Sequence, residues 1–294
     1  MHTARIIGVL WGSMCTSFVA HLQKSIFSCW FLGLVLFLTL SKMERWQNRV
    51  ALVTGASAGV GAGLVQFLCQ NGLRVVGCAR RVEKMEAMKT EKGLENLFPY
   101  KCDLGQEKDI MEMFKWIEEK FGQLDICICN AGFGDGQSLL DGNYSDWRKM
   151  MDVNVLSLNL CTQQSIKMMR KHGINDGQVL FINSDSGYTM SHHDEGKYHF
   201  YSTTKFAVTA LLQGWRSELK DIGSNIRIGQ LSPGFIKTDF FLAMTGDQKA
   251  VDQVYAENDH LTIDNINESI KFMLAAPPNV QIHDILITPT EQRL

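Results

Sequence analysis

The sequence predicts an α/β fold: a doubly wound, parallel, seven-stranded sheet with helices on both faces, forming a single domain behind an apolar leader. Three observations predict it. Short apolar runs alternate with longer segments of helical periodicity from residue 50 onward, and the first run leads into a glycine-rich turn. Strands buried on both faces read as such runs, which is typical of parallel sheets. The 17 residues from Ser25 to Ser41 carry no charge, which marks residues 1–42 as a leader ahead of the domain, residues 43–294.

The expected elements alternate along the domain. The strands are Val50–Val53, Leu73–Cys78, Leu97–Cys102, Leu124–Cys129, Gln178–Asn183, Ile226–Leu231 and Ile282–Ile287. In the first helix apolar residues recur at helical spacing in Leu64, Phe67 and Leu68, and Gly72 ends it. We expect Ser145 to cap the longest helix. The helices are Gly61–Gln70, Glu83–Lys92, Lys108–Phe121, Ser145–His172 and Tyr201–Leu219.

The composition excludes several classes of protein. With 45% hydrophobic and 20% charged residues, the chain is neither collagen-like nor fully disordered. A net charge of −2 gives no electrostatic reason to expect nucleic acid. The eight cysteines include no Cys-x-x-Cys pair, so we expect buried thiols and no metal site.

The leader is open to three interpretations. Its uncharged stretch Ser25–Ser41 is at the short limit of a membrane-spanning helix, which needs about 17–25 apolar residues, so a membrane anchor is the first. A secretory signal is the second, although no small-x-small cleavage pattern follows Leu40. An upstream extension of an enzyme that starts at Met43 is the third. The flanking Lys24 and Lys42 favour a domain that faces the cytoplasm.

A glycine-rich turn, Thr54–Gly61, joins the first strand to the first helix. Glycines let a backbone approach a pyrophosphate, and the helix N-terminus supplies N–H donors and positive potential. This strand–turn–helix context favours a dinucleotide site over a tight turn without a ligand. The residues expected to bind the cofactor here are Gly55, Ser57, Ala58, Gly59, Val60 and Gly61.

The end of the second strand indicates which dinucleotide binds. A carboxylate there would bind the ribose 2′-hydroxyl of NAD, but the sequence has two arginines, Arg80 and Arg81. A guanidinium can pair with a 2′-phosphate, so the sequence predicts NADP, with Arg80 as the first choice and Arg81 as the second. The alternative is a solvated, basic start of a helix.

Tyr201 and Lys205 are four residues apart and therefore share one face of a helix. A phenol has a pKa near 10 and is a poor acid–base group at neutral pH. A nearby ammonium favours the phenolate and lowers that pKa. The pair therefore predicts a catalytic proton donor and acceptor.

Ser184 lies 17 residues before Tyr201, directly after a strand, and Asn154 lies in the middle of a helix. Together with the glycine spacing G-x-x-x-G-x-G, these residues resemble the short-chain dehydrogenase/reductase family over essentially all of residues 43–294. The resemblance implies a catalytic tetrad of Asn154, Ser184, Tyr201 and Lys205. It also implies that Tyr201 and Lys205 contact the cofactor, with Lys205 binding the nicotinamide ribose. It also implies that Ser184 and Tyr201 contact the substrate oxygen.

Other positions match the family's cofactor contacts. Asp103 and Leu104, after the third strand, resemble its adenine contact, with a loop-capping aspartate as the alternative. Asn130 begins an Asn-Ala-Gly triplet that resembles the end of the family's Asn-Asn-Ala-Gly motif. A Pro-Gly-x-x-x-Thr segment implies that the backbone near Ile236 and the hydroxyl of Thr238 hold the nicotinamide amide.

The resemblance implies a Rossmann-type, NADP-dependent oxidoreductase. It would transfer a hydride between NADP(H) and an apolar alcohol or carbonyl, such as a steroid ketone or an isoprenoid alcohol, and would form a homo-oligomer. Two alternatives from other classes remain. One is a non-catalytic NADP-binding scaffold on the same fold. The other is an interaction protein tethered to a membrane through residues 25–41.

Overall fold

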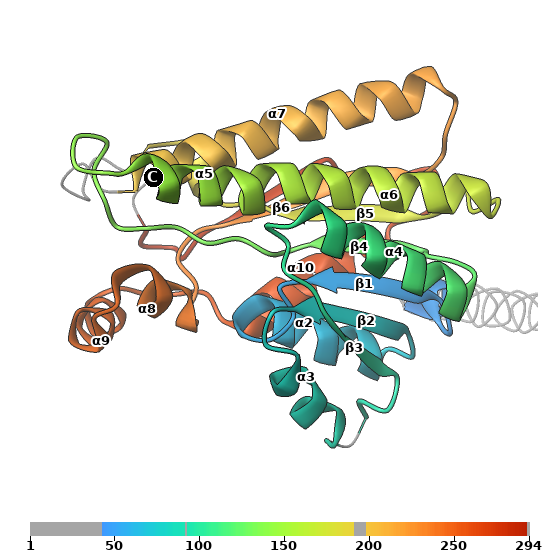
Figure 1. Cartoon of the computed structure of the whole chain (residues 1–294), viewed down its shortest axis with the longest axis horizontal. Helices are drawn as coiled ribbons and strands as arrows, with labels where there is room; N and C mark the ends of the chain where they lie inside the picture. Colours follow the sequence, from blue (N-terminus) through green and yellow to red (C-terminus); the bar gives the residue numbers. More distant parts are fainter. Residues whose placement is uncertain (1–42, 92, 191–197, 293–294) are drawn as a thin grey trace, which may run out of the picture. The chain divides into compact units, whose positions relative to one another are not determined.

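A computed structural model describes residues 43–91, 93–190 and 198–292, and the unit Met43–Leu294 is considered by itself. Its seven strands form one parallel sheet in the order β3-β2-β1-β4-β5-β6-β7 (Figure 1), so the predicted doubly wound sheet is confirmed. The strands are β1 (Val50–Thr54), β2 (Arg74–Ala79), β3 (Leu97–Lys101), β4 (Ile126–Cys129), β5 (Gln178–Ile182), β6 (Arg227–Pro233) and β7 (Asp284–Ile287). The leader, and the tether expected within it, lie outside the described residues.

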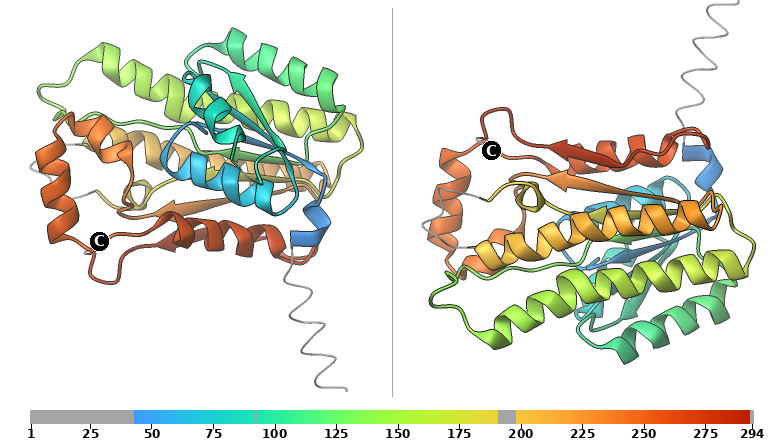
Figure 2. Two further views of the ribbon diagram at one scale, coloured as in Figure 1. Left: turned by 90° about the horizontal axis from the view of Figure 1, so that it is seen from below. Right: turned by 90° about the horizontal axis from the view of Figure 1, so that it is seen from above.

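Helices cover both faces of the sheet (Figure 2). One face carries α2 (Gly59–Gln70), α3 (Val82–Lys89) and α10 (Ile263–Ala275), and the other carries α4 (Glu107–Phe121), α6 (Ser157–Lys171) and α7 (His199–Asp221). Alternate residues of β1 serve the two cores: Val50 and Leu52 pack on the α4 side, and Ala51 and Val53 on the α2 side. Of the helices in the described part of the chain, none combines the length and apolar character that a bilayer crossing requires.

The helix expected to start at Ser145 begins earlier and is interrupted. Asn143, not Ser145, caps α5 (Tyr144–Met151), because its side-chain oxygen accepts a hydrogen bond from the Asp146 N–H at 3.0 Å. A π-helical turn, Asp152–Leu156, then separates α5 from α6. The predicted single helix is therefore two α-helices joined by a wider turn.

Two short helices, α8 (Asp239–Thr245) and α9 (Gln248–Glu257), lie beyond the carboxyl ends of the strands and were not predicted (Figure 1). Thr238 caps α8 by accepting a hydrogen bond from the Phe240 N–H at 3.3 Å. The longer α10 was also missed. No helix was expected between Leu231 and Ile282, where these three helices lie.

The chain enters the domain at the amino edge of the sheet. A 3₁₀ turn, η1 (Met43–Trp46), buries the side chains of Met43 and Trp46. The indole N–H of Trp46 donates to the carbonyl oxygen of Leu274 at 2.9 Å. The guanidinium groups of Arg45 and Arg49 lie 4.2 and 5.0 Å from the Trp46 ring centre, so the indole is held between two cations.

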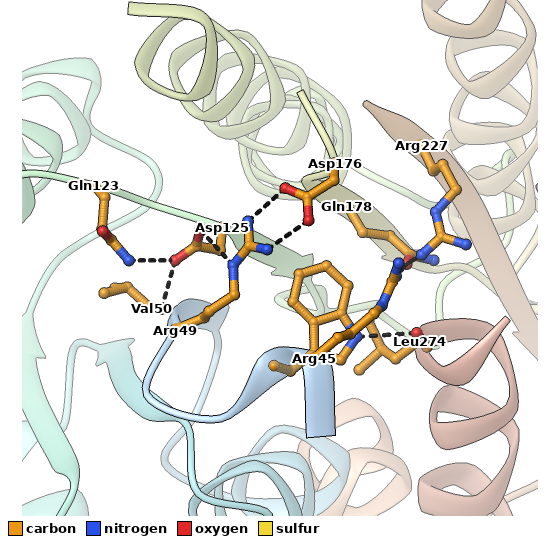
Figure 3. Close-up of polar contacts among 10 residues, drawn as sticks. Arg45, Arg49, Val50, Gln123, Asp125, Asp176, Gln178, Arg227 and Leu274 are labelled. Carbon is orange, nitrogen blue, oxygen red and sulfur yellow. Dashed lines mark hydrogen bonds and ion pairs between the residues drawn. The ribbon is translucent and has the colours of Figure 1, made fainter. Parts of the chain in front are cut away.

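Asp125, directly before β4, joins the amino ends of the two central strands (Figure 3). One carboxylate oxygen accepts from Arg49 Nε at 2.8 Å, and the other accepts from the Val50 N–H and the Gln123 amide, each at 2.8 Å. Arg49 also donates two hydrogen bonds of 2.6 Å to Asp176. The Asp125 side chain is buried and that of Asp176 is 53% exposed, so the two ion pairs differ in their surroundings.

We expect Asp125→Asn to lower the free energy of unfolding by about 3 kcal/mol or more, because it breaks a buried charge pair. Asp176→Asn removes the exposed partner of the same arginine and should cost less than about 1 kcal/mol. Urea unfolding followed by circular dichroism measures both. Equal losses in the two variants would contradict the assignment of Asp125 as the residue that joins β1 to β4.

Candidate active site

The glycine-rich turn lies at the carboxyl end of β1. Gly55 and Gly59 have φ angles of +69° and +54°, a region that favours glycine. A Cβ at Gly61 would lie 2.3 Å from the carbonyl oxygen of Gly55, so a larger residue would push α2 away from the turn. Within the described residues, α2 has no acidic residue in its first turn and no side-chain cap from Ala58. Its first N–H groups can therefore hold an anion.

Asn130 fastens the turn to the end of β4. Its side-chain N–H₂ donates to the carbonyl oxygens of Thr54, at 2.9 Å, and Gly55, at 3.3 Å. The Thr54 hydroxyl in turn accepts from the N–H groups of Asn130 and Ala131, both at 3.0 Å. Thr54 is a positioning residue that sequence reasoning missed. The available signal was a hydroxyl residue at the last position of the strand before the glycines.

Arg80 and Arg81 follow β2 close to the same turn, because the Ala56 N–H donates to the Cys78 carbonyl oxygen at 3.1 Å. Both arginine side chains are exposed. Neither forms an ion pair with another described residue. Their guanidinium groups are therefore available to an anionic ligand, which leaves both candidates for a 2′-phosphate in place.

Three other expected cofactor residues have side chains that point into the protein or hold a loop. Leu104 is buried in the core under α4, and Val60 packs against the core on the other face of the sheet. Only their backbones can face a cofactor. Asp103 accepts a hydrogen bond from the Gly105 N–H at 3.0 Å, which is the loop-capping role given above as the alternative.

The helix α7 places Tyr201 and Lys205 on one face, with Lys205 Nζ 5.5 Å from the Tyr201 ring centre. The Ser184 hydroxyl lies close enough to the phenol to lower its pKa. Ser184 reaches this position as the N-cap of a 3₁₀ turn, Asp185–Gly187, which follows β5 directly. The 3₁₀ turn packs against α7, which brings the serine and the tyrosine close together.

Asn154 lies in the π-helical turn and is 2% exposed. Its side chain accepts from the Phe133 N–H at 3.0 Å and donates to the Phe133 carbonyl oxygen at 2.8 Å and to Thr204 Oγ1 at 3.0 Å. A Cβ at Gly132 would lie 3.4 Å from Asn154 Oδ1 and 3.9 Å from Lys205 Nζ. Asn154 and Lys205 therefore flank one glycine, and the π turn lies at this site, as such turns frequently do.

Burial acts on both members of the Tyr201–Lys205 pair. It raises the pKa of the Tyr201 phenol above its ordinary value of 10, an effect that the neighbouring Ser184 hydroxyl opposes. It lowers the pKa of Lys205 to about 8, against the attraction of Asp185. Lys205 Nζ donates to the carbonyl oxygens of Ile182 and Asn183 at 3.1 and 3.2 Å. In this structure burial therefore raises the phenol pKa, whereas the sequence predicted that it would be lowered.

The segment around Ile236 and Thr238 is held by Tyr255 of α9. The Tyr255 hydroxyl accepts from the Thr238 N–H at 3.1 Å and donates to the Thr238 carbonyl oxygen at 2.9 Å, with the Ile236 carbonyl oxygen at 3.2 Å. A Cβ at Gly59 would lie 3.4 Å from the Thr238 Cβ, so the segment lies beside the glycine-rich turn. Tyr255 was missed, because nothing local in the sequence marks a contact with residues 17 and 19 positions away.

Apolar side chains of α8 lie over the tyrosine. The Phe240 ring centre is 5.9 Å from that of Tyr201, and Phe240 is 37% exposed. A Cβ at Gly134 would lie 2.8 Å from Met244 Sδ and 3.1 Å from the Tyr201 ring. The approach to the phenol is therefore lined by apolar groups, as expected for an apolar ligand.

A family model for short chain dehydrogenases matches residues 49–249. The chain belongs to the short-chain dehydrogenase family. Two similar proteins are dehydrogenase/reductase SDR family member 11 of Bos taurus (43% identity over 255 residues, 85% of this chain and 99% of that protein) and farnesol dehydrogenase of Aedes aegypti (37% over 257 residues, 85% and 100%). The family resemblance read from the motifs is confirmed.

Solved structures of short-chain type agree in fold with this short-chain dehydrogenase. An alcohol dehydrogenase from the archaeon Thermococcus sibiricus, complexed with 5-hydroxy-NADP, has 25% identity and a TM-score of 0.71, covering 84% of this chain and 99% of that chain. A serine dehydrogenase in its closed form, complexed with NADP⁺, has 25% identity and a TM-score of 0.77, covering 83% and 96%.

The pKa of Lys205 predicts a pH dependence of stability. The ammonium has a pKa of about 8 in the folded chain and an ordinary value of 10.5. Between these values the unfolded chain binds the extra proton, so stability rises with pH across this window. Relative to Lys205→Met, we expect the wild type to gain about 3 kcal/mol of unfolding free energy from pH 8 to 10.5.

Urea unfolding of the two proteins at several pH values measures this difference. The hydrogen bonds lost in Lys205→Met add an offset that does not depend on pH. Lys220→Met, on the exposed side of the same helix, is the control and should show no such slope. If the difference in unfolding free energy between the wild type and Lys205→Met does not change with pH, the folded chain does not lower the pKa of Lys205.

Proposed function

We propose that the chain is an NADP-dependent oxidoreductase that interconverts an apolar alcohol and its carbonyl compound. The observation that carries the proposal is the placement of the Ser184 hydroxyl beside the Tyr201 phenol, with the buried Lys205 one helical turn away. A buried lysine is costly to a fold and is typical of a functional site. A scaffold without catalysis would need none of these three groups in contact.

The residues at the carboxyl edge fit NADP(H). The open N-terminus of α2 and the close approach allowed by Gly55 and Gly61 suit the pyrophosphate. Arg80, with Arg81 as the second choice, suits the 2′-phosphate. The segment from Ile236 to Thr238 would hold the nicotinamide amide. When bound, NADPH supplies the hydride.

The side chains of the chain handle the proton. Tyr201 donates its phenolic proton to the carbonyl oxygen of the substrate, or accepts it in the reverse direction. Ser184 hydrogen-bonds the same oxygen and orients it. The ammonium of Lys205 adds positive charge beside the ring, and Asn154 holds the backbone at Gly132 and Phe133 next to that ammonium. Because burial raises the Tyr201 pKa, the phenol keeps its proton at neutral pH, which suits reduction of a carbonyl.

The substrate class follows from the apolar approach to Tyr201. Phe240 and Met244 present a ring and a thioether where the substrate body would lie. One similar protein carries the name farnesol dehydrogenase, which fits an isoprenoid alcohol, and a steroid ketone has comparable apolar bulk. Such ligands bind mainly through buried apolar surface with few polar anchors.

Two further proposals concern the setting of the enzyme. The family resemblance supports a homo-oligomer. The uncharged run at residues 25–41 supports a tether that leaves the domain facing the cytoplasm, with an upstream extension as the alternative. None of the residues assigned to the site comes from the leader, so the catalytic proposal does not depend on it.

We expect Tyr201→Phe to lower turnover by about 10²–10⁴-fold, because it removes the one oxygen that moves the proton. NADPH affinity should change little. Oxidation of NADPH, followed by absorbance, is measured with farnesal and a panel of steroid ketones, and NADPH binding by fluorescence. Tyr144→Phe, on an exposed tyrosine at the start of α5, should retain wild-type rates. Turnover of Tyr201→Phe within a few-fold of wild type would refute the assignment.

We expect Arg80→Asp to move the cofactor preference from NADPH toward NADH. The change removes the partner of the 2′-phosphate and adds a carboxylate that repels it. The ratio of kcat/KM for the two cofactors should fall by at least about tenfold, the equivalent of roughly 1.4 kcal/mol. Lys84→Asp makes the same charge change on the exposed side of α3 and serves as the control. An unchanged ratio in Arg80→Asp would show that another residue reads the phosphate.

A further inference from the structure

The C-terminal segment reaches into the site through one side chain, that of Gln292. Its amide oxygen accepts a hydrogen bond from the Phe235 N–H at 2.9 Å. Its amide N–H₂ donates to Asp185 Oδ2 at 2.5 Å. A Cβ at Gly234 would lie 2.3 Å from the Gln292 oxygen, so a glycine is needed for the amide to fit against this backbone. One amide therefore contacts both loops that follow β5 and β6.

Asp185 passes this contact on to the catalytic serine. Its other carboxylate oxygen, Oδ1, accepts from Ser184 Oγ at 2.8 Å and from the Ser186 N–H at 2.7 Å. Ser184 lies beside the Tyr201 phenol, whose pKa it lowers. A continuous chain of hydrogen bonds therefore runs from Gln292 through Asp185 to Ser184, next to Tyr201.

The backbone hydrogen bonds that join the two loops directly end just beyond the strands. The pairing of β5 with β6 ends at Ile182 and Leu231, and the Asn183 N–H donates to Leu231 at 2.8 Å. Beyond this point the chain of β5 turns into the Ser184 loop, and the chain of β6 runs toward the segment that would hold the nicotinamide. In the described residues, the Gln292 amide is the hydrogen-bonded link between Asp185 and Phe235.

We propose that Gln292 is a positioning residue that acts through Asp185 to hold the Ser184 hydroxyl at a defined distance from the Phe235 segment. The inference rests on the proposed function, because it concerns the geometry of that reaction. The charge matters as well as the shape. The carboxylate of Asp185 can only accept hydrogen bonds here, so position 292 must supply a donor toward it and an acceptor toward the Phe235 N–H. Of the uncharged side chains of this length, glutamine does both.

The test exchanges the donor and the acceptor between the two positions. Gln292→Glu keeps the size and still accepts from Phe235, but it places a carboxylate against Asp185. Asp185→Asn combined with Gln292→Glu restores a donor facing an acceptor, and the side-chain oxygen at position 185 can still accept from Ser184. Glu291→Gln, on the exposed neighbour, is the control for the loss or gain of charge in the tail.

With farnesal and NADPH, we expect Gln292→Glu to lower kcat by about 10²-fold, the scale of a misplacement of 1 Å in an active site. The Kd for NADPH should stay within about twofold. The double variant should recover kcat to within about threefold of wild type, and Glu291→Gln should match wild type. A purely structural role for Gln292 would change the Kd for NADPH together with kcat, because a general loosening of the fold affects both.

Hydrogen–deuterium exchange supplies a readout that does not need turnover. The segments 184–188 and 234–236 should exchange faster in Gln292→Glu and return to wild-type rates in the double variant. If wild type turns over none of the substrates tested but the exchange pattern holds, the proposed function fails and the positioning role stands. Unchanged kcat and exchange in Gln292→Glu, or a double variant that is unfolded or no better than the single one, overturns the proposal.

Discussion

The pairing of β1 with β4 is the constraint on which the site depends. The order of the strands reverses between these two neighbours, and ligands of open α/β sheets bind at such a switch point. Side chains hold both ends of the pair: Asp125 at the amino end, and Asn130 with Thr54 at the carboxyl end. The glycine-rich turn keeps its shape because it is bonded to β4 and not only to its own strand.

Two buried polar groups at the candidate site, Tyr201 and Lys205, lower the stability of the fold. Lys205 is buried among backbone carbonyls, where an ammonium is less favourable than in water, and Tyr201 is buried with its proton attached. Packing alone would favour neither a buried ammonium nor a buried phenol. An oxidised, positively charged nicotinamide ring beside the phenol would add a second cation, and this would favour the phenolate. The resting enzyme and the enzyme with an oxidised cofactor should therefore differ in the charge state of this pair.

Most of the fold could be predicted, because strands buried on both faces and a glycine turn are local signals. The Tyr201–Lys205 pair of the proposed tetrad was also accessible, since a spacing of four residues along one helix places the two side by side. The errors arose where several residues compete or where contacts span the chain. Ser145 was expected to cap a helix that Asn143 caps instead, two residues earlier. Gln292 lies 107 positions from its partner Asp185, so no local pattern could connect them.

The two ends of the domain lie at opposite edges of the sheet. Met43 and Trp46 fasten the chain at the amino edge, whereas Gln292 is engaged at the carboxyl edge beside Ser184. For work with immobilised enzyme, a linker joined ahead of residue 43 would leave the substrate entrance open to solution. An affinity tag added after residue 294 would follow Gln292 closely and would put extra chain near the loops after β5 and β6.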